Sequence, residues 1–331
     1  MKQFLKKSIF FISPLLLLFS IIIATFYILD PFKVINKYKE YTNSIVAYNE
    51  DYIATERFLK NKNEFNSFIL GSSRAGCGFD TNDWNEKLTP TDMSFSFTAS
   101  NESIIGVLGK MKLMEEENTQ IKNVLLVIDS DVTFGKAVYD GHLFIKHPRV
   151  SRSSKSSFIQ KYLQNYIFTG FFIRYLDYKL FRKKRVYMTS FLDFNYESQE
   201  GVYIPYNVSG KEAKILHDTD AYYNKNKNIF YARSSNEKYS QPLLDLKKIK
   251  VIEEIKKIFV LNKTSYKIII SPLYDQKKIN RTDLNILKRV FDEENIFDFS
   301  GKNTITEDKY NYYESSHYRK KVGKQILNIV Y

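Results

Sequence analysis

The stretch FNSFILGSS (Phe65–Ser73) decides the fold, because a short apolar run that ends in glycine and two serines is typical of a buried strand followed by a tight turn. Two further segments have the same character, MSFSFTAS (Met93–Ser100) and the strongly apolar NVLLVIDSD (Asn123–Asp131). A helical pattern at 104–117 separates them. Strands that alternate with helices at this pace indicate a parallel α/β sheet.

The same alternation resumes towards the C-terminus. The predicted elements there are helices at 243–261 and 283–294, strands at Tyr266–Leu273 and Asn295–Ser300, and a final helix from about Tyr318. The stretch between the two halves, about 135–240, is rich in Tyr, Phe, Lys and Ser and has weak periodicity. We therefore expect an α/β fold over 65–331, a three-layer α/β/α sandwich with a short parallel sheet, carrying a mainly helical insertion at about 135–240.

The N-terminus carries the longest apolar stretch, SIFFISPLLLLFSIIIATFYIL (Ser8–Leu29), whose 22 residues contain no charge. A helix of that length covers about 33 Å, enough to cross the hydrocarbon core of a membrane. Lys2, Lys6 and Lys7 precede it, which favours an N-terminus inside and a main domain outside, although lysines also follow the stretch. Another aromatic-rich segment, Tyr166–Phe181, is interrupted by charges and reads as an amphipathic or core helix.

A cleaved signal peptide is the alternative interpretation of the N-terminal stretch. Its apolar region would span about 7–15 residues and end in small residues of the A-x-A kind. The run here is longer, and Ala24 is its only alanine. We therefore expect a single-pass protein of the bacterial inner membrane with the main domain extracytoplasmic and the lipid bilayer as a partner. A cytoplasmic tip and transmembrane anchor would occupy 1–30, and a juxtamembrane helical stalk 31–64.

The net charge of +13 raises the question of a nucleic-acid partner. The lysines are spread along the chain without an RNA- or DNA-binding motif, so we expect no nucleic acid. The single cysteine, Cys77, excludes an intramolecular disulfide and a Cys-based zinc site, and we expect it to be buried. His142 and His147 are five residues apart, which does not match helical zinc ligands. We expect no cofactor.

Candidate catalytic residues follow the predicted strands, where ligands collect in an open α/β sheet. Gly71 allows a sharp turn after the first strand, and Ser72 and Ser73 open the loop. A serine becomes a nucleophile when a base takes its proton, and histidine is the usual base near neutral pH. His317 is the candidate base, and Glu314, three residues earlier, is placed to orient it. We expect this acid-x-x-His segment to open the final helix.

These residues resemble the SGNH/GDSL hydrolase superfamily, in which the nucleophile follows the first strand in a Gly-Asp-Ser segment and the histidine comes near the C-terminus as Asp-x-x-His. The chain has Gly71-Ser72-Ser73 and Glu314-x-x-His317 at the corresponding ends. It is more similar to membrane-anchored branches, such as the DltD and AlgX-like proteins, which carry Gly-Ser-Ser behind an N-terminal anchor. The similarity covers roughly 65–131 and 266–331.

The resemblance implies a serine esterase or O-acyltransferase that acts on a cell-envelope polysaccharide or polymer. A multi-span membrane acyltransferase is a further partner consistent with it. The backbone N–H groups of Ser73 and of the loop Ala99–Ser100–Asn101 would stabilise the oxyanion, and Asn101 adds a side-chain donor. Arg74 is a candidate for holding an anionic substrate group or, equally, a solvated loop residue. The candidate oxyanion and substrate-binding set is completed by Gly71, Ser72, Asp129 and Ser316, and Asp308 is a spare acid.

One motif departs from the family. After the third strand the chain has Asp129-Ser130-Asp131 where the family has Gly-x-Asn-Asp. No asparagine donor is available there, and two acids near a forming oxyanion would oppose it. The departure motivates an alternative, a catalytically silent SGNH-like domain that binds polysaccharide or scaffolds an envelope assembly.

Overall fold

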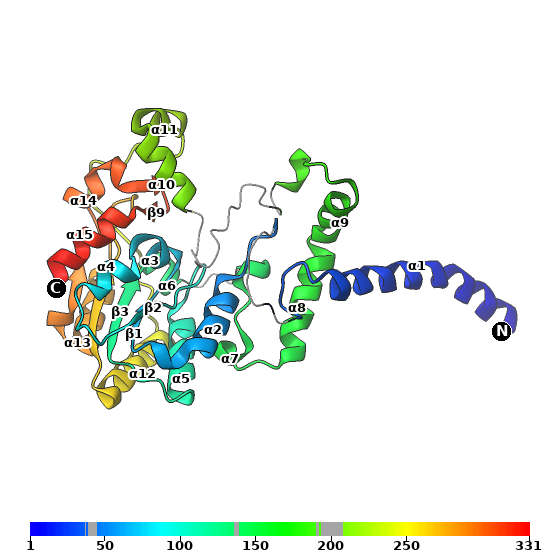
Figure 1. The fold of residues 1–331 in the computed structure, drawn as a ribbon, viewed down its shortest axis with the longest axis horizontal. Helices are drawn as coiled ribbons and strands as arrows, with labels where there is room; N and C mark the ends of the chain where they lie inside the picture. Colours follow the sequence, from blue (N-terminus) through cyan, green and yellow to red (C-terminus); the bar gives the residue numbers. More distant parts are fainter. Residues whose placement is uncertain (37, 39–44, 136–138, 190–191, 193–207) are drawn as a thin grey trace.

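A computed structural model describes residues 1–36, 38, 45–135, 139–189, 192 and 208–331 (Figure 1). Its centre is a five-stranded sheet of order β2-β1-β3-β5-β7, in which every neighbouring pair is parallel. The strands are β1 (Ser67–Leu70), β2 (Ser94–Ser96), β3 (Asn123–Ile128), β5 (Ser265–Ile270) and β7 (Ile296–Asp298). The predicted α/β fold with a parallel sheet is confirmed.

Both faces of this sheet are buried, which explains why its strands read as continuous apolar runs. In β3, Val124, Leu126 and Ile128 join one hydrophobic cluster, and Leu125 and Val127 join a second cluster on the opposite face. The first cluster is built with α2 (Glu50–Asn61), α5 (Ile104–Glu116), α12 (Leu246–Asn262) and α13 (Arg281–Phe291), and the second with α3 (Ser73–Gly78), α4 (Thr81–Asn85) and α15 (Lys320–Val330).

Helix α2 lies within the range 31–64, where we expected a juxtamembrane stalk. Instead of standing free, it packs on the sheet domain through Ala54 and Phe58, which are fully buried. Asn49 caps its first turn by accepting a hydrogen bond from the Tyr52 N–H at 3.0 Å. The amide of the same asparagine donates to the Ile145 carbonyl at 2.7 Å. Helix α2 therefore joins the sheet domain to the inserted segment; residues 37 and 39–44 lie outside the described residues.

The described part of the insertion is mainly helical, as expected. Its elements are η2 (His142–Phe144), α7 (Pro148–Ser151), α8 (Lys155–Phe168), α9 (Phe171–Phe181), η3 (Val186–Met188), α10 (Val208–His217), α11 (Thr219–Lys225) and β4 (Lys238–Tyr239). The single helix that we expected over Tyr166–Phe181 is wrong. Gly170, with a φ of 72°, separates α8 from α9, because this left-handed conformation ends a helix and favours glycine.

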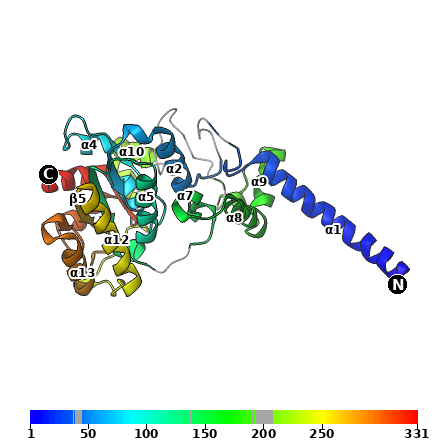
Figure 2. The same ribbon diagram turned by 90° about the horizontal axis from the view of Figure 1, so that it is seen from below.

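Helix α1 (Lys2–Leu29) projects away from the rest of the molecule (Figure 2). Its segment Lys6–Leu29, 24 residues, is long and apolar enough to cross a membrane. Asp30 ends the helix and accepts a hydrogen bond from the Val34 N–H at 3.0 Å. The remaining short elements are η1 (Lys62–Glu64), α6 (Ser130–Thr133), β6 (Lys277–Lys278), η4 (Glu293–Asn295), α14 (Thr304–Glu307), η5 (Lys309–Asn311), β8 (Tyr312–Glu314) and β9 (His317–Tyr318).

Candidate active site

The strand order places two expected loops side by side. The chain moves outward from β1 to β2 in one direction and from β3 to β5 and β7 in the other, so the order reverses between β1 and β3. Such a reversal leaves a crevice at the carboxyl ends of the strands, where ligands bind in open α/β sheets. Ser73 follows β1 and Asp129 follows β3. The two loops therefore meet at the topological switch point.

The turn after β1 fixes Ser73. Gly71 has a φ of 149°, and a Cβ atom there would lie 2.7 Å from the Val127 carbonyl oxygen, so the turn requires glycine. Ser72 caps α3, its hydroxyl accepting a hydrogen bond from the Arg74 N–H at 3.1 Å. Ser73 is the first residue of α3, where a backbone N–H has no partner within the helix. Its side chain is largely buried but faces His317.

Glu314 and His317 come from a short antiparallel hairpin, β8–β9, and sit opposite each other across it. Side chains of directly opposed residues lie on the same face. The His317 Nε2 atom is 3.0 Å from Ser73 Oγ, and its Nδ1 atom is hydrogen-bonded to Glu314. The expectation that this segment opens the final helix is wrong, since α15 begins only at Lys320. The three expected catalytic residues are nevertheless brought together.

Lys211 is a member of this site that the sequence did not suggest. It lies on α10, in the insertion, and its Nζ atom is 2.6 Å from Glu314 Oε2. Burial alone would raise the pKa of Glu314, but the hydrogen bond and charge of His317, together with Lys211, outweigh burial and hold that pKa below its usual value. Glu314 therefore stays ionised beside His317. A separation of 103 residues in the sequence leaves no local signal for this contact.

The two acids after β3 are neutralised locally. Asp129 is fully buried and accepts a hydrogen bond from the Ser72 hydroxyl. The Arg74 guanidinium lies 2.8 Å from Asp131 Oδ1 and 3.9 Å from Asp129 Oδ2. Burial would lower the pKa of Arg74, but both carboxylates outweigh it and raise that pKa. Since Arg74 also donates to the Ser316 carbonyl at 3.1 Å, it joins the two loops and is not a solvated residue.

The loop after β2 is held by a buried acid. We expected the Ala99 N–H to be an oxyanion donor. In the structure it donates a hydrogen bond to the Gly71 carbonyl at 3.2 Å, so this N–H group is already engaged by the backbone. Thr98 Oγ1 donates to Glu50 at 2.7 Å, and the Ser100 hydroxyl lies 3.5 Å from the same carboxylate. Burial raises the pKa of Glu50 to about 7. Glu50 was missed, because it lies within 31–64, where we expected a juxtamembrane stalk and no part of the site.

Other expected residues take structural positions. Asp308 accepts a hydrogen bond from the Tyr310 N–H at 2.8 Å and caps a short helix, so it does not partner His317. His147 contacts Glu56 at 3.0 Å, and His142 contacts the Ala47 carbonyl at 2.9 Å. Cys77 is buried, as expected, and burial raises its pKa well above the usual value.

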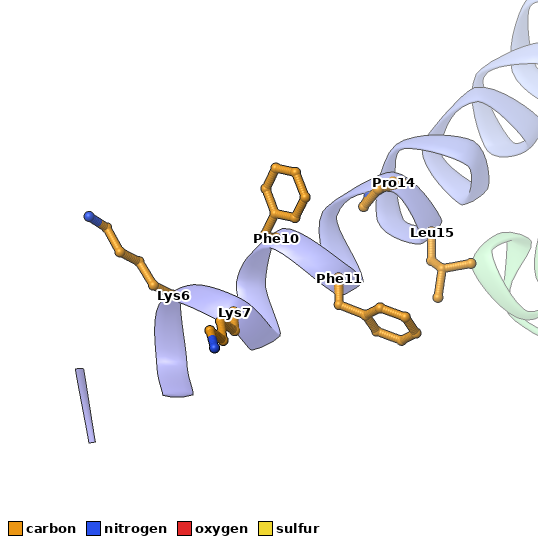
Figure 3. Close-up of a pocket in the computed structure, with 6 residues that line it drawn as sticks. All are labelled: Lys6, Lys7, Phe10, Phe11, Pro14 and Leu15. Atoms are coloured by element: carbon orange, nitrogen blue, oxygen red, sulfur yellow. The ribbon is translucent and has the colours of Figure 1, made fainter. Parts of the chain in front are cut away.

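Two hollows differ in their relation to this site. One, of about 820 Å³, lies along the N-terminal turns of α1, and every residue lining it belongs to that helix (Figure 3). This hollow is the side of a projecting apolar helix, and we assign it no part in the candidate active site. The other, of about 270 Å³, adjoins the site through Asp131. Its lining is Ser130, Asp131, Tyr239, Ser240, Gln241, Leu243, Leu273, Asp275 and Lys277.

The serine, histidine and glutamate can act together as nucleophile, base and orienting acid, since each neighbouring pair is in hydrogen-bond contact. Among the described residues, no group of three or more His, Cys, Asp or Glu side chains could hold a metal ion. The chain matches no family model and no curated protein.

Proposed function

We propose that this protein is a membrane-anchored, extracytoplasmic serine esterase or O-acyltransferase of the SGNH type, acting on a cell-envelope polysaccharide or polymer. The observation that carries the proposal is the contact series from Ser73 Oγ through His317 to Glu314. Ser73 and His317 are 244 residues apart in the sequence, so local sequence does not account for their contact. The strand order and the burial of both sheet faces support the three-layer sandwich of that superfamily.

The proposed reaction uses these contacts. His317 Nε2 takes the Ser73 hydroxyl proton as Oγ attacks an ester carbonyl, and Glu314 stabilises the imidazolium that forms. The Ser73 N–H and the Asn101 amide are the proposed oxyanion donors. Collapse of the tetrahedral intermediate breaks the ester C–O bond, and His317 returns the proton to the leaving alcohol. The acyl group on Ser73 then passes to water or to an acceptor hydroxyl, which His317 deprotonates in the same way; the bond between Ser73 Oγ and the acyl carbon breaks, and His317 returns the proton to Ser73 Oγ.

The hollow beside Asp131 is the proposed place for the acceptor. Carboxylates, an amide and hydroxyl groups line it, and these groups can hydrogen-bond a polyhydroxylated ligand. Arg74 keeps Asp131 paired at the boundary between the hollow and the catalytic serine. The Lys-rich N-terminus and the apolar segment of α1 support an N-terminus inside and this site outside the bacterial inner membrane. A multi-span acyltransferase in the same membrane is a proposed acyl donor.

A serine-reactive fluorophosphonate tests the proposal on the full chain in detergent. We expect labelling of the wild type, none of Ser73→Ala, and labelling slowed by at least about a hundredfold in His317→Ala and Glu314→Gln, since both remove activation of the serine. Ser316→Ala is the matched control, because among the described residues this exposed turn serine contacts the site through its carbonyl, which the substitution keeps. A folded wild type that stays unlabelled would count against catalysis and favour polysaccharide binding.

A further inference from the structure

A second surface, away from the candidate active site, combines exposed apolar side chains with basic residues. It belongs to α8, α9 and the segment FRKKRVYM (Phe181–Met188). Phe168, Leu180, Phe181 and Val186 are between 67% and 89% exposed. Apolar side chains exposed together in this way mark a surface that meets a membrane or another partner.

The surface lies at the end of α1. Thr25 Oγ1 and the Tyr166 hydroxyl are 3.1 Å apart, and the rings of Phe26 and Tyr166 have centroids 5.5 Å apart. Thr25 and Phe26 belong to the last two turns of the apolar segment. Figure 1 shows α8 lying across α1 and not along it. A membrane crossed by α1 would therefore have α8 along its outer surface.

The basic end of α9 lies at the same level. Lys179 Nζ lies 5.3 Å from the centroid of the Tyr175 ring, and Tyr175 is buried in the same hydrophobic cluster as Phe26 and Phe32. Phe32 belongs to the segment that leaves α1, and its ring centroid is 4.7 Å from that of Phe171, the first residue of α9. Helix α9 therefore lies beside the point where the apolar segment of α1 ends and the polar segment from Asp30 begins.

We propose that α8, α9 and Phe181–Met188 form a hairpin that lies on an anionic phospholipid bilayer and inserts its exposed apolar side chains at headgroup level. Apolar residues flanked by lysine and arginine are typical of interfacial helices. Basic side chains such as Lys179, Arg182 and Lys183 gain from neighbouring anionic lipid. Lipid is a better candidate than a second protein, because the surface of α8 and α9 lies beside the end of α1, where that helix would leave the membrane. The proposal rests on α1 crossing a membrane and not on the serine chemistry.

The test measures the depth of one side chain in the full chain, reconstituted in vesicles of phosphatidylcholine and phosphatidylglycerol. Leu180→Cys carries an environment-sensitive fluorophore, and buried Cys77 does not compete for the label. Leu261→Cys is the matched control, since Leu261 is exposed to the same extent but lies on α12, in the sheet domain. We expect a lipid-borne nitroxide to reduce the emission at position 180 at least about twofold and to leave position 261 unchanged.

Equal quenching at the two positions, or none at position 180, overturns the proposal. A blue-shifted emission at 180 without quenching also overturns it, because a protein surface would then cover the hairpin. The charges are tested by adding Lys179→Gln, Arg182→Gln and Lys183→Gln. We expect this variant to lose about half or more of the quenching in anionic vesicles and to match the parent in phosphatidylcholine alone. An unchanged signal in anionic vesicles would overturn recognition of anionic lipid.

Discussion

At the scale of single residues, four buried ionisable groups and the partly buried Lys146 lie next to the loop after β2. Lys110 Nζ is 2.6 Å from Glu102 Oε2 and 3.3 Å from Asp51 Oδ1, and Lys146 Nζ is 3.6 Å from Asp51. Glu50 is the third acid of this group. Two lysines balance two carboxylates, so the group is neutral when Glu50 holds a proton. Burial of an unmatched charge is costly, which agrees with the raised pKa of Glu50.

We predict that Glu50→Gln stabilises the protein increasingly as the pH rises from 5 to 8. In the wild type the pKa of Glu50 is about 7 in the folded state, against 4.5 as its ordinary value. The protonated form is favoured by the fold, so the cost of ionising Glu50 begins above pH 4.5 and is complete above pH 7. The full cost is at most about 3 kcal/mol. Thermal unfolding across this range measures it.

The control for this prediction is Glu64→Gln, which changes an exposed glutamate in η1, directly after α2. It should shift the unfolding temperature equally at every pH. If Glu50→Gln and the wild type gave parallel curves of unfolding temperature against pH, Glu50 would not be the group that carries the extra proton.

At the scale of elements, the strands that are buried on both faces of the sheet could be predicted from their apolar sequence. The apolar run Asn123–Ile128 became β3 because both of its faces are covered, and Gly71 marked the end of β1 because the turn admits no Cβ. The β8–β9 hairpin was missed, since strands of two or three residues have no resolvable periodicity. The contact of Glu314 with Lys211 could not be predicted, because it depends on how the insertion folds back over the sheet.

Helix α3 packs against both α15 and β9, the hairpin strand that carries His317. A Cβ atom on Gly323 of α15 would lie 1.9 Å from the Gly78 carbonyl oxygen at the end of α3. We predict that Gly323→Ala lowers the free energy of unfolding by at least about 2 kcal/mol, because a backbone oxygen cannot yield as a side chain can. It should also slow fluorophosphonate labelling of Ser73. Denaturant unfolding measures the first effect.

Gln325→Ala on the exposed side of α15 is the matched control, since it adds no atom between the helices. We expect it to change the free energy of unfolding by less than about 0.5 kcal/mol. Equal stability of Gly323→Ala and Gln325→Ala would mean that α15 can move away from α3, and that the hairpin is held by other contacts.

At the scale of the whole molecule, α1 is joined to the folded part and is not a loose leader. Phe26 is fully buried in a cluster with Phe32, Tyr162 and Tyr166, which also holds α8 and α9. The cluster connects to the sheet domain through Asn49, whose amide donates to the Tyr162 hydroxyl at 2.8 Å. A bilayer around α1 would therefore fix the orientation of the whole domain, and with it the side from which a polymer reaches the proposed catalytic serine.

We predict that α1 remains on the mature protein. The apolar segment is longer than that of a signal peptide and lacks an A-x-A end, so the intact mass of the purified chain should include residues 1–30, and carbonate washing should leave the chain in the membrane. Ile22→Ala is the informative control, because with Ala24 it completes that pattern and should permit cleavage. A wild-type chain shortened in the same way would contradict the anchor and remove the basis of the membrane-surface hairpin. The contacts of the serine, histidine and glutamate would not be affected by that result, and fluorophosphonate labelling would still test them.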